Sequence, residues 1–166
     1  YIAVCAVGRL GDQDSDQGDI AAQQRVMTVN YTGPACLMGL LAERMLTRDS
    51  GILIGIGSVA GDRGRAANYI YGSAKAGFAA YLAGLRNRLS ASGVHVMTVK
   101  PGFVATRMTQ DMDLPDVLTA KPEKLAGKII SAAGKKRNVI YSDSKWWLIM
   151  TILCAIPEPL FKKLRI

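Results

Sequence analysis

Four short runs of strand character constrain the fold of this chain most strongly, because longer stretches of helical character separate them. The run at 50–58, SGILIGIGS, is apolar almost throughout, whereas a strand with one face in water would alternate apolar and polar residues. The other runs lie at 1–7, 94–100 and 138–142. Buried strands that alternate with helices of this length indicate a parallel sheet in a doubly wound α/β fold.

Helices are expected between these strands, at 20–47, at 71–92 and from about Pro122. In doubly wound sheets the reactive groups lie just beyond the carboxyl ends of the strands. Candidate site residues should therefore lie in the segments that follow Val7, Gly57 and Lys100.

The cysteine and histidine content argues against several kinds of site. Cys5, Cys36 and Cys154 are odd in number and far apart, so they suggest neither a disulfide framework nor a metal cluster, and they favour a cytoplasmic setting. The only histidine, His95, falls in the apolar run GVHVMTVK, where a space-filling strand residue is expected. A hydrolase built on serine, histidine and aspartate therefore lacks a suitable base.

The net charge of +8 is concentrated toward the C-terminus. Residues 1–120 hold 11 basic and 10 acidic side chains, whereas residues 121–166 hold 10 basic and 3 acidic ones. This asymmetry argues against a nucleic-acid surface spread over the whole domain. It also raises the question of what the basic C-terminal segment contacts.

A tyrosine and a lysine four residues apart, Tyr71 and Lys75, stand at the start of the second expected helix. This spacing puts both side chains on one helical face. Ser58 lies 13 residues before Tyr71, at the carboxyl end of a buried strand, and the intervening loop can fold its hydroxyl back beside the tyrosine. Asn30 lies 28 residues before Ser58, inside the preceding helix.

The same tyrosine–lysine spacing occurs a second time, at Tyr141 and Lys145, and serves as a control. Thirteen residues before Tyr141 is Lys128, which is expected on a helix, so no strand end supplies a hydroxyl there. A two-residue match is a weak signal by itself, and this second pair is interpreted as structural.

This chain resembles the short-chain dehydrogenase/reductase family in an ordered set of residues, namely Asn30, Ser58, Tyr71-x-x-x-Lys75, Pro101-Gly102 and Thr106. The resemblance covers nearly the whole chain. It implies a Rossmann-like domain, of which residues 1–144 form the C-terminal part, followed by an apolar and basic extension at 145–166. It also implies NAD or NADP as the cofactor, and reduction of a ketone or oxidation of a secondary alcohol.

The resemblance further implies a role for each catalytic candidate. A ketone needs a proton at its oxygen as hydride arrives, and a free tyrosine, with a pKa of about 10, cycles poorly at neutral pH. Tyr71 would be the acid in reduction and the base in oxidation, and the Lys75 ammonium would lower its pKa. Ser58 would donate a hydrogen bond to the carbonyl oxygen, and Asn30 would anchor a water that links Lys75 to solvent.

The family pattern also implies contacts with the cofactor. Lys75 would hold the nicotinamide ribose, and Thr106, with the backbone after Pro101, would hold the carboxamide. The full set of expected cofactor contacts is Gly8, Tyr71, Lys75, Pro101, Gly102 and Thr106.

Two departures from the family pattern stand out. Cys5-Ala6-Val7-Gly8 replaces the usual Asn-Asn-Ala-Gly, so the sheet-bracing asparagine is missing, although Gly8 still lets backbone approach a cofactor. Residues 51–57, GILIGIG, have the glycine spacing of the cofactor phosphate loop, but their isoleucines and leucine predict a strand. The true loop is expected upstream of Tyr1, in about 80 further residues.

The C-terminal extension admits two interpretations. Its unbroken apolar part, 146–156, has 11 residues, which is too short to cross a bilayer. It forms either a core or dimer-interface segment, or a peripheral anchor on the inner face of the membrane. In the second case Lys162, Lys163 and Arg165 would meet anionic head groups.

Within the family, this extension together with GDQ at 11–13 and VAGDRGR at 59–65 is similar to the reductases of polyprenyl-phosphate sugars, nearest to decaprenylphosphoryl 2-keto-pentofuranose reductases. The similarity implies a lipid-linked ketosugar as substrate. Arg63 and Arg65 would then reach a substrate phosphate, or else remain solvated loop arginines.

Two further expectations concern assembly and class. Small residues follow one another at four-residue spacing on the helix that carries Tyr71, at Gly72, Ala76, Ala80 and Gly84. They favour a homodimer or homotetramer, or close packing within the chain itself. The alternative to an enzyme is a non-catalytic interaction or assembly module that retains the fold.

Overall fold

The main sheet of the protein, seen in a computed structural model that describes residues 1–164, contains four parallel strands. They are β1 (Ile2–Cys5), β2 (Gly51–Ile56), β3 (Val94–Lys100) and β6 (Val139–Tyr141), in the spatial order β1-β2-β3-β6. Each strand lies within a run predicted from its apolar residues. The parallel α/β sheet is therefore confirmed.

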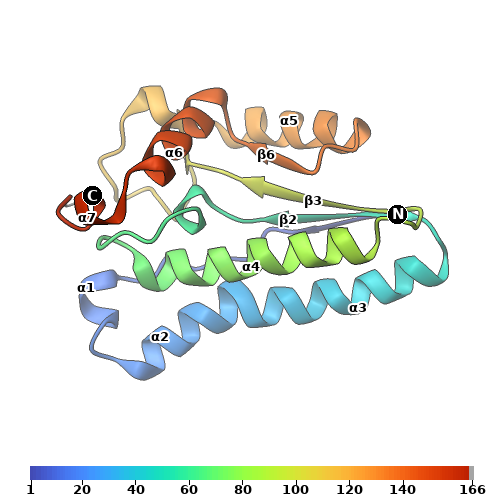
Figure 1. Cartoon of the computed structure of the whole chain (residues 1–166), viewed down its shortest axis with the longest axis horizontal. Helices are drawn as coiled ribbons and strands as arrows, with labels where there is room; N and C mark the ends of the chain where they lie inside the picture. Colours follow the sequence, from blue (N-terminus) through green and yellow to red (C-terminus); the bar gives the residue numbers. More distant parts are fainter. Residues whose placement is uncertain (165–166) are drawn as a thin grey trace.

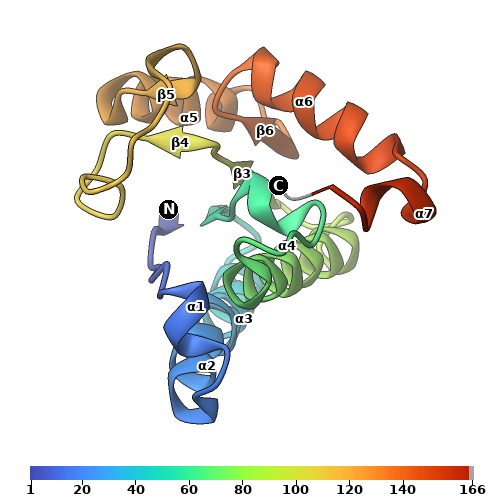
Figure 2. The same ribbon diagram turned by 90° about the vertical axis from the view of Figure 1, so that its left-hand side faces the viewer.

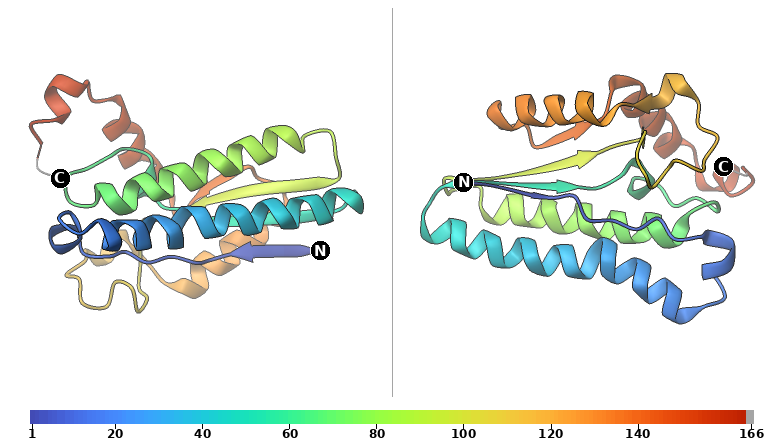
Figure 3. Two further views of the ribbon diagram at one scale, coloured as in Figure 1. Left: turned by 90° about the horizontal axis from the view of Figure 1, so that it is seen from below. Right: turned by 180° about the vertical axis from the view of Figure 1, so that it is seen from behind.

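Helices cover both faces of this sheet (Figure 1, Figure 2). One layer contains α2 (Ile20–Met27), α3 (Gly33–Thr47) and α4 (Tyr69–Arg88), and the other contains α5 (Pro122–Gly134) and α6 (Ser144–Ala155). Figure 3 shows α3 and α4 side by side along the sheet. The smaller elements are α1 (Gln13–Asp16), α7 (Glu158–Phe161), and a two-stranded sheet of β4 (Phe103–Val104) and β5 (Thr119–Ala120).

Burial on both faces explains the continuous apolar character of β2. Leu53 packs into the core beneath α3 and α4, with Met38 and Phe78, while the next residue, Ile54, packs into the core beneath α5, with Leu125. Successive strand residues point to opposite faces, so a strand covered on both sides has no position for a polar residue.

The glycines of β2 serve packing, as expected for a strand. A Cβ atom at Gly55 would lie 2.3 Å from Leu82 and 3.1 Å from Phe78, so the missing side chain lets α4 approach the sheet closely. A Cβ atom at Gly57 would lie 3.2 Å from the Val99 carbonyl oxygen. The glycine spacing of residues 51–57 therefore belongs to helix–sheet and strand–strand contact.

Two local features were not predicted from the sequence. The helix expected at 20–47 is interrupted by a π-helical turn at Thr28–Thr32. The C-terminal extension, for which no regular structure was predicted, forms α6 and α7. Among residues 1–164, no helix combines the length and apolar character that a membrane crossing requires.

Candidate active site

A cavity of about 550 Å³ opens at the carboxyl ends of the parallel strands. This is the edge of the sheet where the sequence places the reactive groups. Every proposed catalytic or cofactor residue except Asn30 lines it, namely Gly8, Ser58, Tyr71, Lys75, Pro101, Gly102 and Thr106. The structure thus brings together residues that are up to 98 positions apart in the sequence.

Tyr71 and Ser58 meet in the cavity wall from different elements. Tyr71 lies in the first turn of α4, and Ser58 directly follows β2. Burial raises the pKa of Tyr71, and the Ser58 hydroxyl beside it opposes that rise. Ser58 Oγ also accepts a hydrogen bond from the Ala60 backbone N–H at 3.1 Å, so it caps the short turn after β2 as well.

Lys75 is 3% exposed, and its Nζ donates hydrogen bonds to the carbonyl oxygens of Val7 and Ile56, both at 3.2 Å. Burial lowers the pKa of Lys75 to about 8. The Nζ atom lies 5.8 Å from the centre of the Tyr71 ring. Burial is the largest influence on Tyr71 and raises its pKa, whereas the family resemblance led us to expect that Lys75 would lower it.

Asn30 lies behind the cavity, in the π-helical turn, and is fully buried. Its side chain accepts a hydrogen bond from the Arg9 N–H at 3.2 Å and donates to the carbonyl oxygens of Arg9 at 2.7 Å and Val26 at 2.8 Å. Asn30 therefore fastens the segment after β1. Cys5, at the position of the family's bracing asparagine, packs in the apolar core.

Gly8 and Gly102 each allow a close approach in the cavity wall. A Cβ atom at Gly8 would lie 3.3 Å from Lys75 Nζ and 3.2 Å from Asn30 Oδ1. A Cβ atom at Gly102 would lie 2.0 Å from Trp146, so this glycine lets the α6 tryptophan close one side of the cavity. The Gly102 N–H donates to Ser142 Oγ at 3.1 Å, which fixes the turn after β3.

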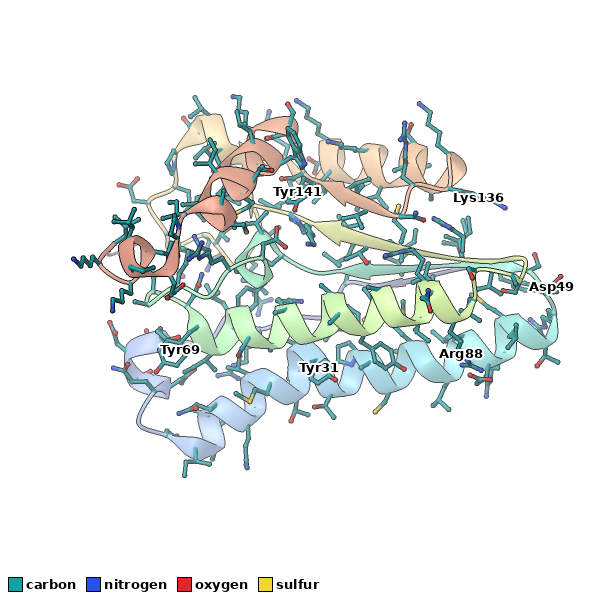
Figure 4. All side chains as sticks on the ribbon, in the orientation of Figure 1. Tyr31, Asp49, Tyr69, Arg88, Lys136 and Tyr141 are labelled. Carbon is teal, nitrogen blue, oxygen red and sulfur yellow. The ribbon has the colours of Figure 1, made fainter. Side chains whose placement is uncertain are left out.

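The control pair has a structural role, which is consistent with its interpretation. The hydroxyl of Tyr141, whose side chain is labelled in Figure 4, donates to Asp62 Oδ2 at 2.8 Å. Lys145 Nζ donates to the Val117 carbonyl at 3.1 Å. Burial, reinforced by the Asp62 carboxylate, raises the pKa of Tyr141. Neither Tyr141 nor Lys145 is among the described residues that line the cavity.

Asp62 is a supporting residue that sequence reasoning missed. Its carboxylate forms an ion pair with Lys100 and accepts the hydrogen bond from Tyr141. These contacts tie the loop after Ser58 to the ends of β3 and β6. A lone aspartate in a polar loop gives no signal in the sequence, because its partners lie 38 and 79 residues away.

Arg63 and Arg65 have different surroundings. Arg63 Nη1 donates to the carbonyl oxygens of Leu153 at 2.7 Å, Cys154 at 3.1 Å and Ile156 at 2.6 Å. Its Nη2 pairs with Glu158 at 2.9 Å, and the guanidinium lies 3.7 Å from the centre of the Phe161 ring. Arg63 therefore neither faces a substrate phosphate nor remains solvated, because it caps α6. Arg65 lines the cavity.

The extension has a buried face and an exposed face. Trp146 and Met150 are buried, and the Trp146 ring packs edge-on against Phe103 with centres 5.1 Å apart. On the opposite face, Trp147 is 54% exposed and Ile152 is 56% exposed. Lys162 and Lys163 are exposed, while Arg165 lies outside the described residues.

Comparison with known proteins gives a consistent result. The family model described as short chain dehydrogenase matches residues 2–116. An uncharacterized oxidoreductase of Mycobacterium tuberculosis is 39% identical over 154 residues, which is 93% of this chain and 60% of that protein. One of Streptomyces coelicolor is 36% identical, over 95% of this chain and 62% of its own length. This chain therefore spans about 60% of the length of these relatives.

Solved structures share the fold at low sequence identity. A short chain dehydrogenase from Burkholderia cenocepacia in complex with NADP superposes with a TM-score of 0.84 at 19% identity, covering 98% of this chain and 68% of that one. One from Sphingobium yanoikuyae in complex with NADPH has a TM-score of 0.80 at 22% identity, covering 95% and 66%. The Rossmann-like fold is thereby confirmed.

Proposed function

Because the chain belongs to the short-chain dehydrogenase family, we propose that it carries the catalytic part of an NAD(P)-dependent oxidoreductase that reduces a ketone or oxidises a secondary alcohol. The observation that carries this proposal is the convergence of Ser58, Tyr71 and Lys75 on one cavity at the carboxyl edge of the sheet. The relatives named as oxidoreductases, and the fold shared with proteins crystallised with NADP or NADPH, agree with it.

The residues present fit a nicotinamide cofactor. Lys75 Nζ has three hydrogens, and two of them bond to the carbonyls of Val7 and Ile56, so one remains for a ribose hydroxyl. Gly8 leaves the approach to Nζ open. Pro101 and Thr106 lie in the wall of the same cavity and would hold the carboxamide. When bound, the cofactor supplies the hydride.

Tyr71 provides the proton in the reducing direction. Because burial raises its pKa, the phenol is protonated at neutral pH and can donate its hydrogen to the substrate oxygen. The Ser58 hydroxyl stabilises negative charge as it develops on that oxygen. The buried Lys75 ammonium, 5.8 Å from the ring, then stabilises the phenolate that remains.

The test is an assay of the full-length protein with NADH or NADPH and a panel of small and amphiphilic ketones. The measured quantity is the rate at which the reduced cofactor is consumed. Consumption of NADH or NADPH that depends on an added ketone would support the proposed oxidoreductase activity. A protein that binds neither cofactor and turns over no ketone would instead be an interaction module that retains the fold.

At a finer level, we propose a lipid-linked ketosugar as the substrate, with peripheral membrane contact through 145–166. The surface of the extension supports this proposal, because Trp147, Leu148 and Ile152 are exposed on α6 and Lys162 and Lys163 are exposed after α7. Apolar side chains can insert between lipid head groups while lysines pair with anionic lipids.

Substitution of Trp147 and Ile152 by alanine should reduce binding of the full-length protein to anionic vesicles about 10-fold, because both side chains would otherwise be buried in the interface. Co-sedimentation measures this effect, and added salt should weaken wild-type binding through the lysine contribution. The matched control replaces Ile20 on α2 and Ile130 on α5, which are both 74% exposed and lie outside the extension. Equal losses in both variants, or no wild-type binding, would exclude the anchor.

We also propose that the full-length protein forms a dimer or tetramer through α3 and α4. Leu37 and Leu40 on α3 are 49% and 66% exposed, and Gly84 on α4 is open to solvent. The other end of the small-residue row packs within the chain, because a Cβ atom at Gly72 would lie 2.8 Å from the Ala60 carbonyl oxygen.

The substitution Leu40→Asp should therefore shift the full-length protein toward the monomer in light scattering, since it places a charge in an apolar interface. A wild-type protein that is already monomeric at micromolar concentration would contradict the proposal.

A further inference from the structure

Arg65 is a cation in the cavity wall without an anionic partner. Its Nε atom is buried and has no hydrogen-bond partner, and no acidic side chain of residues 1–164 forms an ion pair with it. Burial lowers the pKa of Arg65, but a guanidinium keeps its proton at physiological pH. A partly buried charge with no partner is unfavourable, and an anion that enters the cavity would relieve it.

The whole cavity has one sign of charge. Its charged lining residues among those described are Arg65, Lys75 and Arg107, and neither aspartate nor glutamate lines it. Most of the remaining wall is apolar, including Phe103, Leu125 and Trp146. Low-dielectric walls strengthen such a field, so the cavity attracts anions.

The backbone around Arg65 is held in place from both sides. Asp62 is bound by Lys100 and Tyr141, and Arg63 is bound to the end of α6. The Arg65 carbonyl accepts a hydrogen bond from the Asn68 N–H at 3.1 Å. Because this backbone is already fixed, binding of a ligand to Arg65 would cost little backbone freedom.

A second polar group in the same wall lacks a partner. Asn68 Oδ1 is buried and unbonded, and Asn68 lines the cavity three residues after Arg65 and three before Tyr71. Buried polar atoms in native proteins are normally satisfied, so these two atoms on one wall are available to bond a polar ligand in place of water. The guanidinium suits an oxyanion, and the amide oxygen suits a hydroxyl.

We propose that Arg65 is the anion-binding residue of the substrate site, and that the substrate is a hydroxylated ketone or alcohol bearing a phosphate or carboxylate. This inference rests on the proposed oxidoreductase function. It assigns to Arg65, and not to Arg63, the recognition of the charged group, while Ser58 and Tyr71 act on the carbonyl.

Direct binding tests the site independently of turnover. In isothermal titration of the full-length protein, hexyl phosphate should bind at least about 10-fold more tightly than hexan-1-ol. Arg65→Gln should lower the affinity for hexyl phosphate about 10- to 100-fold, the range for a charge-assisted hydrogen bond, with a much smaller change for the alcohol. Arg65→Lys should retain part of the affinity, because it keeps the charge but loses the fork of donors.

Arg107→Gln is the matched control, since it removes the same charge from an exposed position of the same cavity. It should cost clearly less than Arg65→Gln. Equal losses in the two variants, or a wild type that binds hexyl phosphate and hexan-1-ol alike, would overturn the assignment. Substituting hexanoate for hexyl phosphate distinguishes a carboxylate from a phosphate preference.

The two proposals fail in different ways. If hexyl phosphate binds in a way that depends on Arg65 but the protein reduces no ketone, the anion-binding role of Arg65 is supported and the oxidoreductase activity is refuted. If the protein reduces ketones but the rate depends neither on a negative charge of the substrate nor on Arg65→Gln, the oxidoreductase activity is supported and the anion-binding role of Arg65 is refuted.

Discussion

Replacing Tyr71 by phenylalanine is expected to lower the turnover number of the full-length protein about 10²- to 10⁴-fold, the contribution typical of a general acid. The substitution removes only the phenolic oxygen, and the ring keeps its place at the start of α4. The ketone would then receive hydride with no proton donor at its oxygen. The dissociation constant of the cofactor should change little, because Lys75 and the glycine approach remain.

The matched control is Tyr69→Phe, on the same helix two residues earlier. Tyr69 is 45% exposed and lies at the start of α4 (Figure 4), and it is not among the described residues that line the cavity. Its loss of the hydroxyl should leave turnover near wild type. Near-wild-type turnover in Tyr71→Phe would mean that another group donates the proton, and equal damage in both variants would point to a general effect on the helix.

Most of the fold could be predicted because burial leaves a direct trace in the sequence. A strand covered on both faces, such as β2, has no polar position, and Gly55 is explained by the close approach of α4. Features that depend on distant partners could not be predicted. The π-helical turn places Asn30 against the Arg9 backbone, and no local pattern near Asn30 encodes that contact.

In the candidate site, too, local features could be predicted from the sequence and contacts with distant segments could not. Tyr71 and Lys75 share a helical face by spacing alone, and the position of Ser58 after a buried strand predicts the edge where it lies. The separate surroundings of Arg63 and Arg65 could not be predicted, because they arise from where α6 ends. Two arginines two residues apart look equivalent in a sequence, yet one holds the C-terminal helix and the other lines the cavity.

Lys75→Met is expected to stabilise the protein while abolishing turnover. The ammonium is buried against two backbone carbonyls and no carboxylate of the described chain, and burial lowers its pKa from 10.5 to about 8. This shift corresponds to about 3 kcal/mol of folding free energy lost at pH 7, which an apolar side chain of similar length would partly recover. Turnover should disappear, because neither the ribose contact nor the positive charge near Tyr71 remains.

The pH dependence of the stability difference between Lys75→Met and wild type tests whether the buried ammonium causes it. Between pH 8 and 10.5 the folded wild type has released the Lys75 proton while the unfolded chain still binds it, so wild-type stability rises with pH in that window. The free energy of unfolding of Lys75→Met, measured by denaturant unfolding of the full-length protein, should therefore exceed that of wild type most at pH 7, and this difference should shrink by about 3 kcal/mol toward pH 10.5.

Lys100→Met is the control of opposite sign, because it leaves the buried Asp62 carboxylate without its cation and should destabilise the protein. A Lys75→Met variant less stable than wild type at pH 7 would show that the two carbonyl hydrogen bonds outweigh the cost of burying the charge.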